Sequence, residues 1–166
     1  MNDFDEFFFE HYPRVVGSLR LAGGELAEAE DAAQEGFAKA MTRWKSVSMM
    51  DRPATWVYVV AVREMRRRGR PREEPMDARP DAHDSAAPDH AGAVVAAATI
   101  ERALSRLAPR QRLAIVLRFH ADLTVAEVSQ AMRCSEGTVK STLHTALERL
   151  RVDLGDRGLE GAHDGP

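Results

Sequence analysis

The side chains best suited to recognise a ligand in this sequence lie between Thr124 and Arg151, in TVAEVSQAMRCSEGTVKSTLHTALERLR. Short hydrogen-bonding and basic residues recur there on one face of a predicted helix, at Lys140, Ser141, His144, Thr145 and Arg149. Residues of these types bind base edges in the major groove and the phosphates beside it. The segment therefore predicts a DNA recognition helix; the alternative is an ordinary helical hairpin with a solvated polar face.

A second group of residues is basic. In ATWVYVVAVREMRRRGRP, arginines recur every three or four residues and so fall on one face of a predicted helix, at Arg63, Arg66, Arg67 and Arg70. We call this set the arginine stripe. Guanidinium groups in such a row suit a phosphate backbone. The segment KSVSMMDR before the helix predicts a loop that contains Met49 and Met50.

A third group is acidic. The segment ELAEAEDAAQEGFAKAMTRW predicts a helix whose apolar face comprises Leu26, Ala29, Ala33, Phe37, Met41 and Trp44. The opposite side carries an acidic face, made of Glu30, Asp31, Gln34 and Glu35. Acidic residues favour the first turn of a helix, but this set extends beyond it. It predicts either contact with a basic partner surface or a merely solvated face.

Local capping signals predict the elements that position the recognition residues. Thr124 and Glu127 form a capping box for a helix of about two turns. Arg133 and Cys134 form the following turn, and Ser135 suits the N-cap of the recognition helix. Apolar residues at helical spacing predict its buried side, at Val139, Leu143, Leu147 and Leu150. A further apolar set is expected to pack beneath these helices, at Leu104, Leu107, Leu113, Val116 and Leu117.

The N-terminal part predicts a helical domain with its own core. It begins with an apolar stripe at Phe4, Phe7 and Phe8. Pro13 predicts an interruption, and Gly23 with Gly24 predicts the end of this helical region. Pro53 suits the first turn of the helix that carries the arginine stripe.

The segment PREEPMDARPDAHDSAAPDHAGA, residues 71–93, is rich in Pro, Ala and Asp and predicts a flexible acidic linker. It would separate a domain over 1–70 from one over 94–152, and residues 153–166 predict a disordered tail. The linker is either a solvated spacer or a nucleic-acid mimic for a basic channel of a partner. His83 and His90 lie in it, but a disordered segment offers a metal no preorganised geometry, so no metal site is predicted.

Composition limits the class of protein. The chain has 166 residues, a formal net charge of −3 and one cysteine, Cys134, which excludes an internal disulfide. No nucleophile arrangement, metal cluster or phosphate loop is recognisable, so neither an enzyme nor a cofactor is predicted. No apolar run approaches the roughly 20 residues that span a membrane, and the N-terminus MNDFDEFFF is acidic. We therefore expect a cytosolic protein without membrane insertion.

These segments, taken in order, resemble an extracytoplasmic-function (ECF) RNA polymerase sigma factor of the sigma-70 family, similar to the actinobacterial sigma-E-like group. The resemblance rests on AEDAAQEGFAKAMTRW, on RPATWVYVVAVREMRRRGR and on LSRLAPRQRLAIVLRFHADLTVAEVSQAMRCSEGTVKSTLHTALERLR, and covers nearly the whole chain. It implies an all-α fold of two small domains, a sigma-2-like helical bundle and a sigma-4-like helix-turn-helix domain.

The resemblance also implies roles for the three groups of residues. The acidic face would bind the clamp helices of core RNA polymerase. The loop with Met49 and Met50, together with the arginine stripe, would read the minus-ten promoter element as single strand. Trp56 and Tyr58 are candidates for stacking on a melted base, although Trp56 also suits the core. The recognition helix would read the minus-thirty-five element as duplex, with Arg149 on a phosphate.

Three departures from the family pattern limit these implications. Relatives often have Leu-Gly where Met132 and Arg133 stand, so a left-handed turn would have to form without glycine. Relatives tend to carry arginine where Thr142 and Thr145 stand, which predicts weaker phosphate binding. Glu64 stands where relatives commonly have asparagine, which leaves the minus-ten preference open.

The implied partners are core RNA polymerase and promoter DNA, with an anti-sigma factor left open. A flexible linker of this length spans about 30 Å, less than the spacing of the two promoter elements. We therefore expect the free protein to be compact or mobile, and core polymerase to spread its domains. Two other functions remain: a helix-turn-helix transcription regulator that cannot melt promoters, and a protein-interaction module that binds no promoter even with core polymerase.

Overall fold

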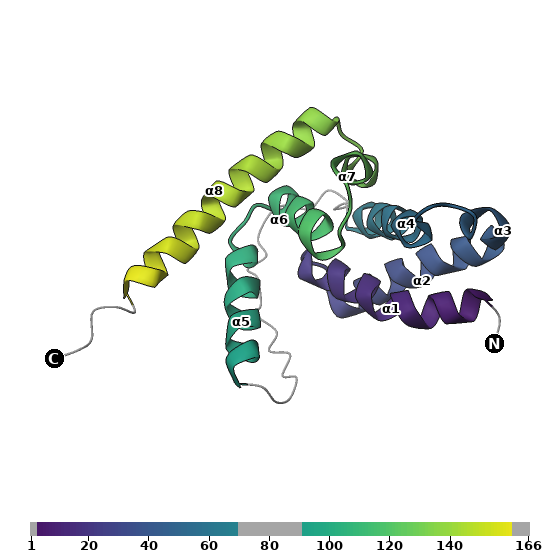
Figure 1. The fold of residues 1–166 in the computed structure, drawn as a ribbon, viewed down its shortest axis with the longest axis horizontal. Coiled ribbons are helices and arrows are strands. Elements are labelled where there is room, and N and C mark those ends of the chain that lie inside the picture. Colours follow the sequence, from purple (N-terminus) through teal and green to yellow (C-terminus); the bar gives the residue numbers. More distant parts are fainter. Residues whose placement is uncertain (1–2, 70–90, 161–166) are drawn as a thin grey trace.

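Every regular element in the described part of the chain is a helix, which confirms the predicted all-α fold. The structure is a computed structural model that describes residues 3–69 and 91–160 (Figure 1). Its elements are α1 (Asp3–Leu21), α2 (Leu26–Thr42), α3 (Trp44–Val47), α4 (Pro53–Arg68), α5 (Ala91–Ser105), α6 (Pro109–Ile115), the π-helix η1 (Val116–His120), α7 (Val125–Met132) and α8 (Glu136–Glu160). Arg70 and the linker residues up to 90, including His83 and His90, lie outside the described residues.

Helices α1, α2 and α4 form the N-terminal bundle, which corresponds to the predicted first domain (Figure 1). Its fully buried side chains include Val15, Leu19, Phe37, Val57 and Val62. At Gly36 of α2 an added Cβ would lie 3.2 Å from the Val57 carbonyl oxygen of α4. The absence of a side chain there lets α2 and α4 approach closely.

Two elements of the bundle differ from the sequence prediction. Helix α1 continues through Pro13, so the predicted interruption is wrong. Side chains on both sides of Pro13 pack against the bundle: Phe7 before it contacts the ring of Phe37, and Leu19 after it is buried. This packing outweighs the backbone hydrogen bond that Pro13 cannot donate. The predicted loop over 45–52 begins as the short helix α3, which is anchored by the buried Val47.

The C-terminal part consists of α6 and η1 packed against α7 and α8. All the residues predicted to lie beneath the helix-turn-helix are buried, namely Leu104, Leu107, Leu113, Val116 and Leu117. The structure differs from the predicted tail, because α8 continues as a helix to Glu160. One contact that holds this extension is an ion pair of 3.7 Å between Arg106 and Asp153. Helix α5 also begins at Ala91, inside the predicted linker.

The two parts pack against each other. Helix α4 lies against α7, and α1 lies against η1 (Figure 1). The buried apolar residues of both parts belong to one continuous cluster. Among the described residues, no helix is long and apolar enough to cross a membrane.

Candidate nucleic-acid interface

The helix-turn-helix is built by the capping residues that the sequence predicts. The Thr124 Oγ1 accepts a hydrogen bond from the Glu127 N–H at 3.2 Å, and Glu127 Oε2 accepts one from the Thr124 N–H at 2.7 Å. The Ser135 Oγ accepts from the Thr138 N–H at 3.1 Å and so caps the start of α8. Between these helices Arg133 adopts φ 53° and ψ 51°, the left-handed conformation expected to form there without glycine.

The recognition residues share the exposed side of α8. Lys140, Ser141, His144, Thr145 and Arg149 are all exposed, whereas Val139, Leu143 and Ala146 face the core. The hydroxyls of Ser141 and Thr145 donate to carbonyl oxygens one turn earlier, at 3.0 and 3.1 Å. This leaves their lone pairs directed outward as acceptors. The structure therefore presents the predicted set as one continuous polar surface.

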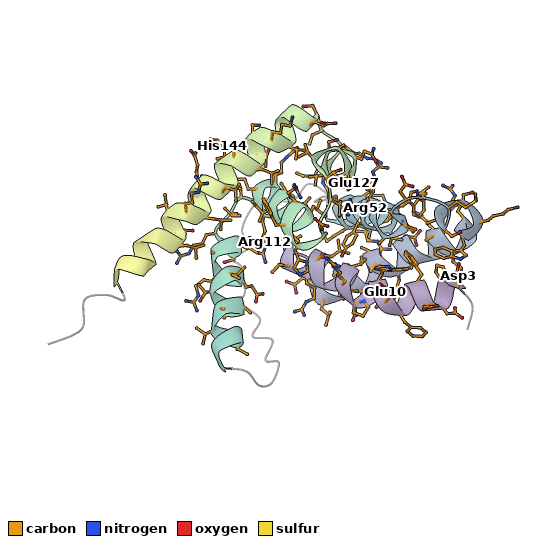
Figure 2. All side chains as sticks on the ribbon, viewed as in Figure 1. Asp3, Glu10, Arg52, Arg112, Glu127 and His144 are labelled. Atoms are coloured by element: carbon orange, nitrogen blue, oxygen red, sulfur yellow. The ribbon has the colours of Figure 1, made fainter. Side chains whose placement is uncertain are left out.

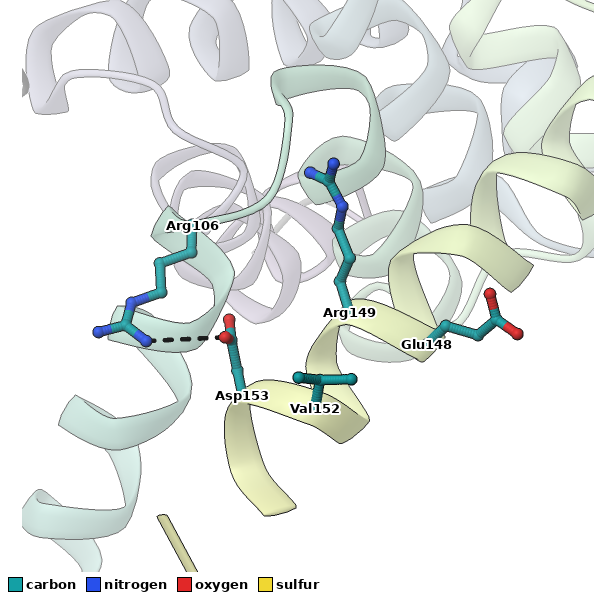
Figure 3. Close-up of a pocket in the computed structure, with 5 residues that line it drawn as sticks. All are labelled: Arg106, Glu148, Arg149, Val152 and Asp153. Atoms are coloured by element: carbon teal, nitrogen blue, oxygen red, sulfur yellow. Dashed lines mark ion pairs between the residues drawn. The ribbon is translucent and has the colours of Figure 1, made fainter. Parts of the chain in front are cut away.

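Two members of this set have charged neighbours. The His144 Nε2 lies 3.3 Å from the Glu148 carboxylate, one turn along α8. Arg149 lies at the edge of the surface, beside a shallow hollow between the end of α5 and α8 that is also lined by Arg106, Val152 and Asp153 (Figure 3). Arg149 lies one turn beyond Thr145 on the exposed side of α8, and its contact to a phosphate stays a prediction.

The arginine stripe is not a free surface in this conformation. Arg63 donates to the Gln130 carbonyl oxygen at 2.9 Å, and Arg66 donates to that of Met132 at 2.6 Å, both at the C-terminal end of α7. Arg67 instead pairs with Glu64 at 2.9 Å. The predicted stripe is therefore divided between a contact to the helix-turn-helix and a local ion pair, and its fourth member, Arg70, is outside the described residues.

The residues proposed to contact melted bases differ in exposure. Met49 and Met50 are exposed, with fractions of 83% and 42%. Tyr58 is buried, its hydroxyl lies 3.2 Å from the Ser18 Oγ, and burial raises its pKa. Trp56 is partly buried and packs against the core. Tyr58 is thus the less available of the two stacking candidates, because it is the one that the core encloses.

The acidic face lies on α2, as predicted, but its charges are partly neutralised within the chain. Asp31 pairs with Arg68 at 3.1 Å, and Glu35 pairs with Lys39 at 3.1 Å. Lys39 also contacts Glu64 of α4 at 2.6 Å. Hydrogen bonds from Lys39 and Arg67 lower the pKa of Glu64, and the contact with Glu64 raises the pKa of Lys39. These successive ion pairs link the acidic face of α2 to Arg67 of α4.

Sequence reasoning missed the arginines that join the two parts of the molecule. Arg52 donates to the Glu127 carboxylate at 2.7 Å and to the Asp122 carbonyl oxygen at 2.6 Å (Figure 2). Arg112 donates to the Leu21 carbonyl oxygen at 2.6 Å, and burial lowers the pKa of its guanidinium group. No local pattern signals these pairs, because their members lie far apart in the chain.

His120 belongs to the same junction. Its Nδ1 lies 2.8 Å from the Ser18 Oγ, which itself donates to the Arg14 carbonyl oxygen at 3.0 Å. Because the single Ser18 proton is used in that bond, we assign the Nδ1–H tautomer to His120. Burial and the nearby Arg14 lower the pKa of His120, which favours the neutral ring.

Comparison with known sequences places both parts in described families. Residues 7–73 match Sigma-70 region 2 and residues 103–152 match Sigma-70 region 4. The RNA polymerase sigma-E factor of Streptomyces coelicolor is 31% identical over 162 residues, which are 95% of this chain and 89% of that protein. The ECF RNA polymerase sigma factor RpoE of Cereibacter sphaeroides is 31% identical over 91% of this chain and 86% of its own length.

Solved structures show a similar fold. The sigma factor RpoE of Bartonella quintana, in complex with the anti-sigma factor NepR, has a TM-score of 0.65 at 23% identity over 93% of this chain and 98% of that one. CnrH in complex with the cytosolic domain of CnrY has a TM-score of 0.59 at 19% identity over 92% of this chain and 88% of that one. The helical arrangement is therefore that of these proteins.

Proposed function

The chain belongs to the extracytoplasmic-function RNA polymerase sigma factors of the sigma-70 family, and we propose that the recognition face of α8 and the arginine stripe of α4 are its two promoter-binding surfaces. As a sigma factor it directs core RNA polymerase to promoters and so starts DNA-templated transcription. The alternative of a regulator without sigma activity is not favoured, because the similarity covers region 2 as well as region 4.

The exposed face of α8 is the observation that best supports the minus-thirty-five assignment. Lys140, Ser141, His144 and Thr145 stand on the first turns of a helix that a capped, buried helix-turn-helix holds in place. A helix presented in this way fits the major groove. For the minus-ten element, the support comes from Met49 and Met50, exposed beside the helix that carries Arg63, Arg66 and Arg67.

We assign core RNA polymerase binding to the acidic face of α2, through Glu30, Asp31, Gln34 and Glu35. The protein then contributes binding specificity and promoter melting rather than bond chemistry, in the cytoplasm where polymerase and DNA meet. The complex of RpoE with the anti-sigma factor NepR makes an anti-sigma factor a further expected partner.

Transcription from fragmented genomic DNA by purified core RNA polymerase, with and without this protein, tests the proposal. We expect protein-dependent start sites that share two upstream elements. Lys140→Ala should reduce these starts about tenfold, since one lost contact in a specific site costs about 1–3 kcal/mol. Arg102→Ala, a charge-matched change on the exposed side of α5, should leave them unchanged. Binding to core without any protein-dependent start would contradict sigma activity.

A further inference from the structure

The acidic face of α2 and the basic end of α4 supply counter-ions to each other inside the N-terminal bundle. The last turn of α4 carries Arg66, Arg67 and Arg68. Arg68 reaches across to α2, where its Nη1 lies 3.1 Å from the Asp31 carboxylate. Helices α2 and α4 lie side by side (Figure 1). The surface proposed for core RNA polymerase therefore meets the basic end of α4 in one ion pair.

This ion pair holds two charges that outside partners could use. The side chains of Asp31 and Arg68 are 63% and 36% exposed, so both lie within reach of a partner. While the pair is intact, a phosphate that approaches Arg68 meets a neutralised guanidinium group with a carboxylate beside it. A basic side chain that approaches Asp31 likewise meets a positive charge. Hydrogen bonds to such partners are charge-assisted like those within the pair, so one can replace the other at little cost.

A second set of ion pairs on the same face is built differently. Glu35 pairs with Lys39 at 3.1 Å, and Lys39 also lies 2.6 Å from Glu64 of α4. The Glu64 side chain is only 13% exposed and holds Arg67 as well. Lys39 therefore keeps a carboxylate partner when Glu35 is engaged elsewhere, and Arg67 stays on Glu64. Of the two acidic residues, it is Asp31 that has an arginine of α4 as its direct partner.

We propose that the ion pair of Asp31 with Arg68 couples two binding surfaces: a basic group of core RNA polymerase that takes Asp31 releases Arg68, which then binds a phosphate of the minus-ten strand. The proposal rests on the proposed function, in which the acidic face binds core polymerase. Linkage makes the coupling reciprocal, because a phosphate that takes Arg68 frees Asp31 and raises the affinity for core polymerase by the same factor. The strength of an exposed ion pair sets this factor at about two- to fivefold.

Substitutions of the two partners should act in opposite directions on the two ligands. Asp31→Asn should raise the affinity of the full chain for a short single-stranded oligonucleotide about two- to threefold and weaken its binding to core polymerase. Arg68→Gln should weaken oligonucleotide binding and strengthen binding to core polymerase about two- to threefold. Fluorescence anisotropy with a labelled oligonucleotide measures the first affinity. Competition with labelled wild-type chain for core polymerase measures the second.

Matched controls separate this exchange from a general change of charge. Glu6 of α1 and Arg43 at the end of α2 are exposed, and neither side chain has a hydrogen-bond or ion-pair partner among the described residues. Glu6→Gln should leave both affinities unchanged, and Arg43→Gln should not strengthen binding to core polymerase. Glu35→Gln removes a charge one turn from Asp31. It should raise the oligonucleotide affinity less than half as much as Asp31→Asn, because Lys39 keeps its other carboxylate partner.

The double variant Asp31→Asn with Arg68→Gln identifies the cause of any gain. We expect the gain in oligonucleotide affinity from Asp31→Asn to disappear when Arg68 is absent; a gain that persists comes from the lost negative charge alone and overturns the proposal. Unchanged core binding in Arg68→Gln also overturns it, even where Asp31→Asn weakens core binding as the proposed function requires. If Asp31→Asn leaves core binding unchanged, the proposed function of Asp31 itself is wrong. Far-ultraviolet circular dichroism establishes that each variant remains folded.

Discussion

Glu127 serves two elements at once. Its Oε2 accepts from the Thr124 N–H that starts α7 and from Arg52 of the other part of the molecule, each at 2.7 Å. Glutamine can accept in place of the capping carboxylate, but alanine cannot. Glu127→Ala should therefore lower the free energy of unfolding by about 1 kcal/mol or more, and Glu127→Gln by less than half of that. Urea unfolding of the full chain measures both, and equal losses would show that the ion pair, not the cap, dominates.

Glu64 makes the stability of the N-terminal bundle depend on pH. Its pKa is lowered from 4.5, so the folded state gains stability from the ionised carboxylate above that pH and loses it as the pH falls through the lowered value. Lys39 is partly exposed and Arg67 is largely exposed, and the screening by solvent limits the contribution to about 1 kcal/mol. A double-mutant cycle of Glu64→Gln and Lys39→Met should show coupling at pH 7 that is lost once acid protonates the Glu64 carboxylate. Coupling that persists in acid would refute the assignment.

A substitution of Thr145 by arginine tests whether the recognition face of α8 has too little positive charge to bind phosphates strongly. Thr145 is exposed on the recognition face of α8, at a position where the family resemblance leads us to expect arginine. Thr145→Arg should tighten binding to all duplexes alike and increase the salt slope by about one, because an added phosphate contact carries no sequence information. Fluorescence anisotropy with a promoter duplex and a scrambled duplex over a salt series measures this. A gain confined to one sequence would instead indicate a base contact.

At the scale of elements, the packing of α2 on α4 depends on Gly36. An added Cβ would lie 3.3 Å from both the Ala61 Cβ and the Val57 Cγ1, as well as close to backbone of α4, so Gly36→Ala forces the helices apart. We expect a loss of about 1–3 kcal/mol in the free energy of unfolding. Gly17 in α1 is the matched control, since its added Cβ meets nothing within 4 Å, and Gly17→Ala should stabilise by about 0.5–1 kcal/mol. Thermal unfolding of both variants checks the opposite signs.

The elements also show where sequence reasoning ends. The caps at Thr124 and Ser135 are local chemistry, so the helix-turn-helix and its exposed face could be predicted from short patterns. The continuation of α1 through Pro13 could not, because it depends on packing against α2. Nor could the partners of Arg63, because Gln130 is brought to it only by the tertiary fold.

At the scale of the whole molecule, the junction between the two parts combines a continuous apolar cluster with contacts from arginine side chains. Arginine contacts to helix ends are screened by salt, whereas apolar burial is not. The free protein should therefore open as ionic strength rises, even though its domain cores stay folded. Labels at the exposed Glu10 of α1 and Ser105 of α5, in a Cys134→Ser background, report the distance between the parts by energy transfer.

We expect transfer between these labels to fall between about 0.05 and 1 M salt, a range over which the Debye length drops to about 3 Å. Core RNA polymerase should produce a similar fall at low salt, since the two promoter elements are farther apart than the linker spans at rest. A matched pair of labels within the N-terminal bundle, at Glu10 and Lys45, should show no change. If transfer between Glu10 and Ser105 is insensitive to salt and to polymerase alike, the apolar contacts hold the parts together, and the helix-turn-helix must reach its element from a closed molecule.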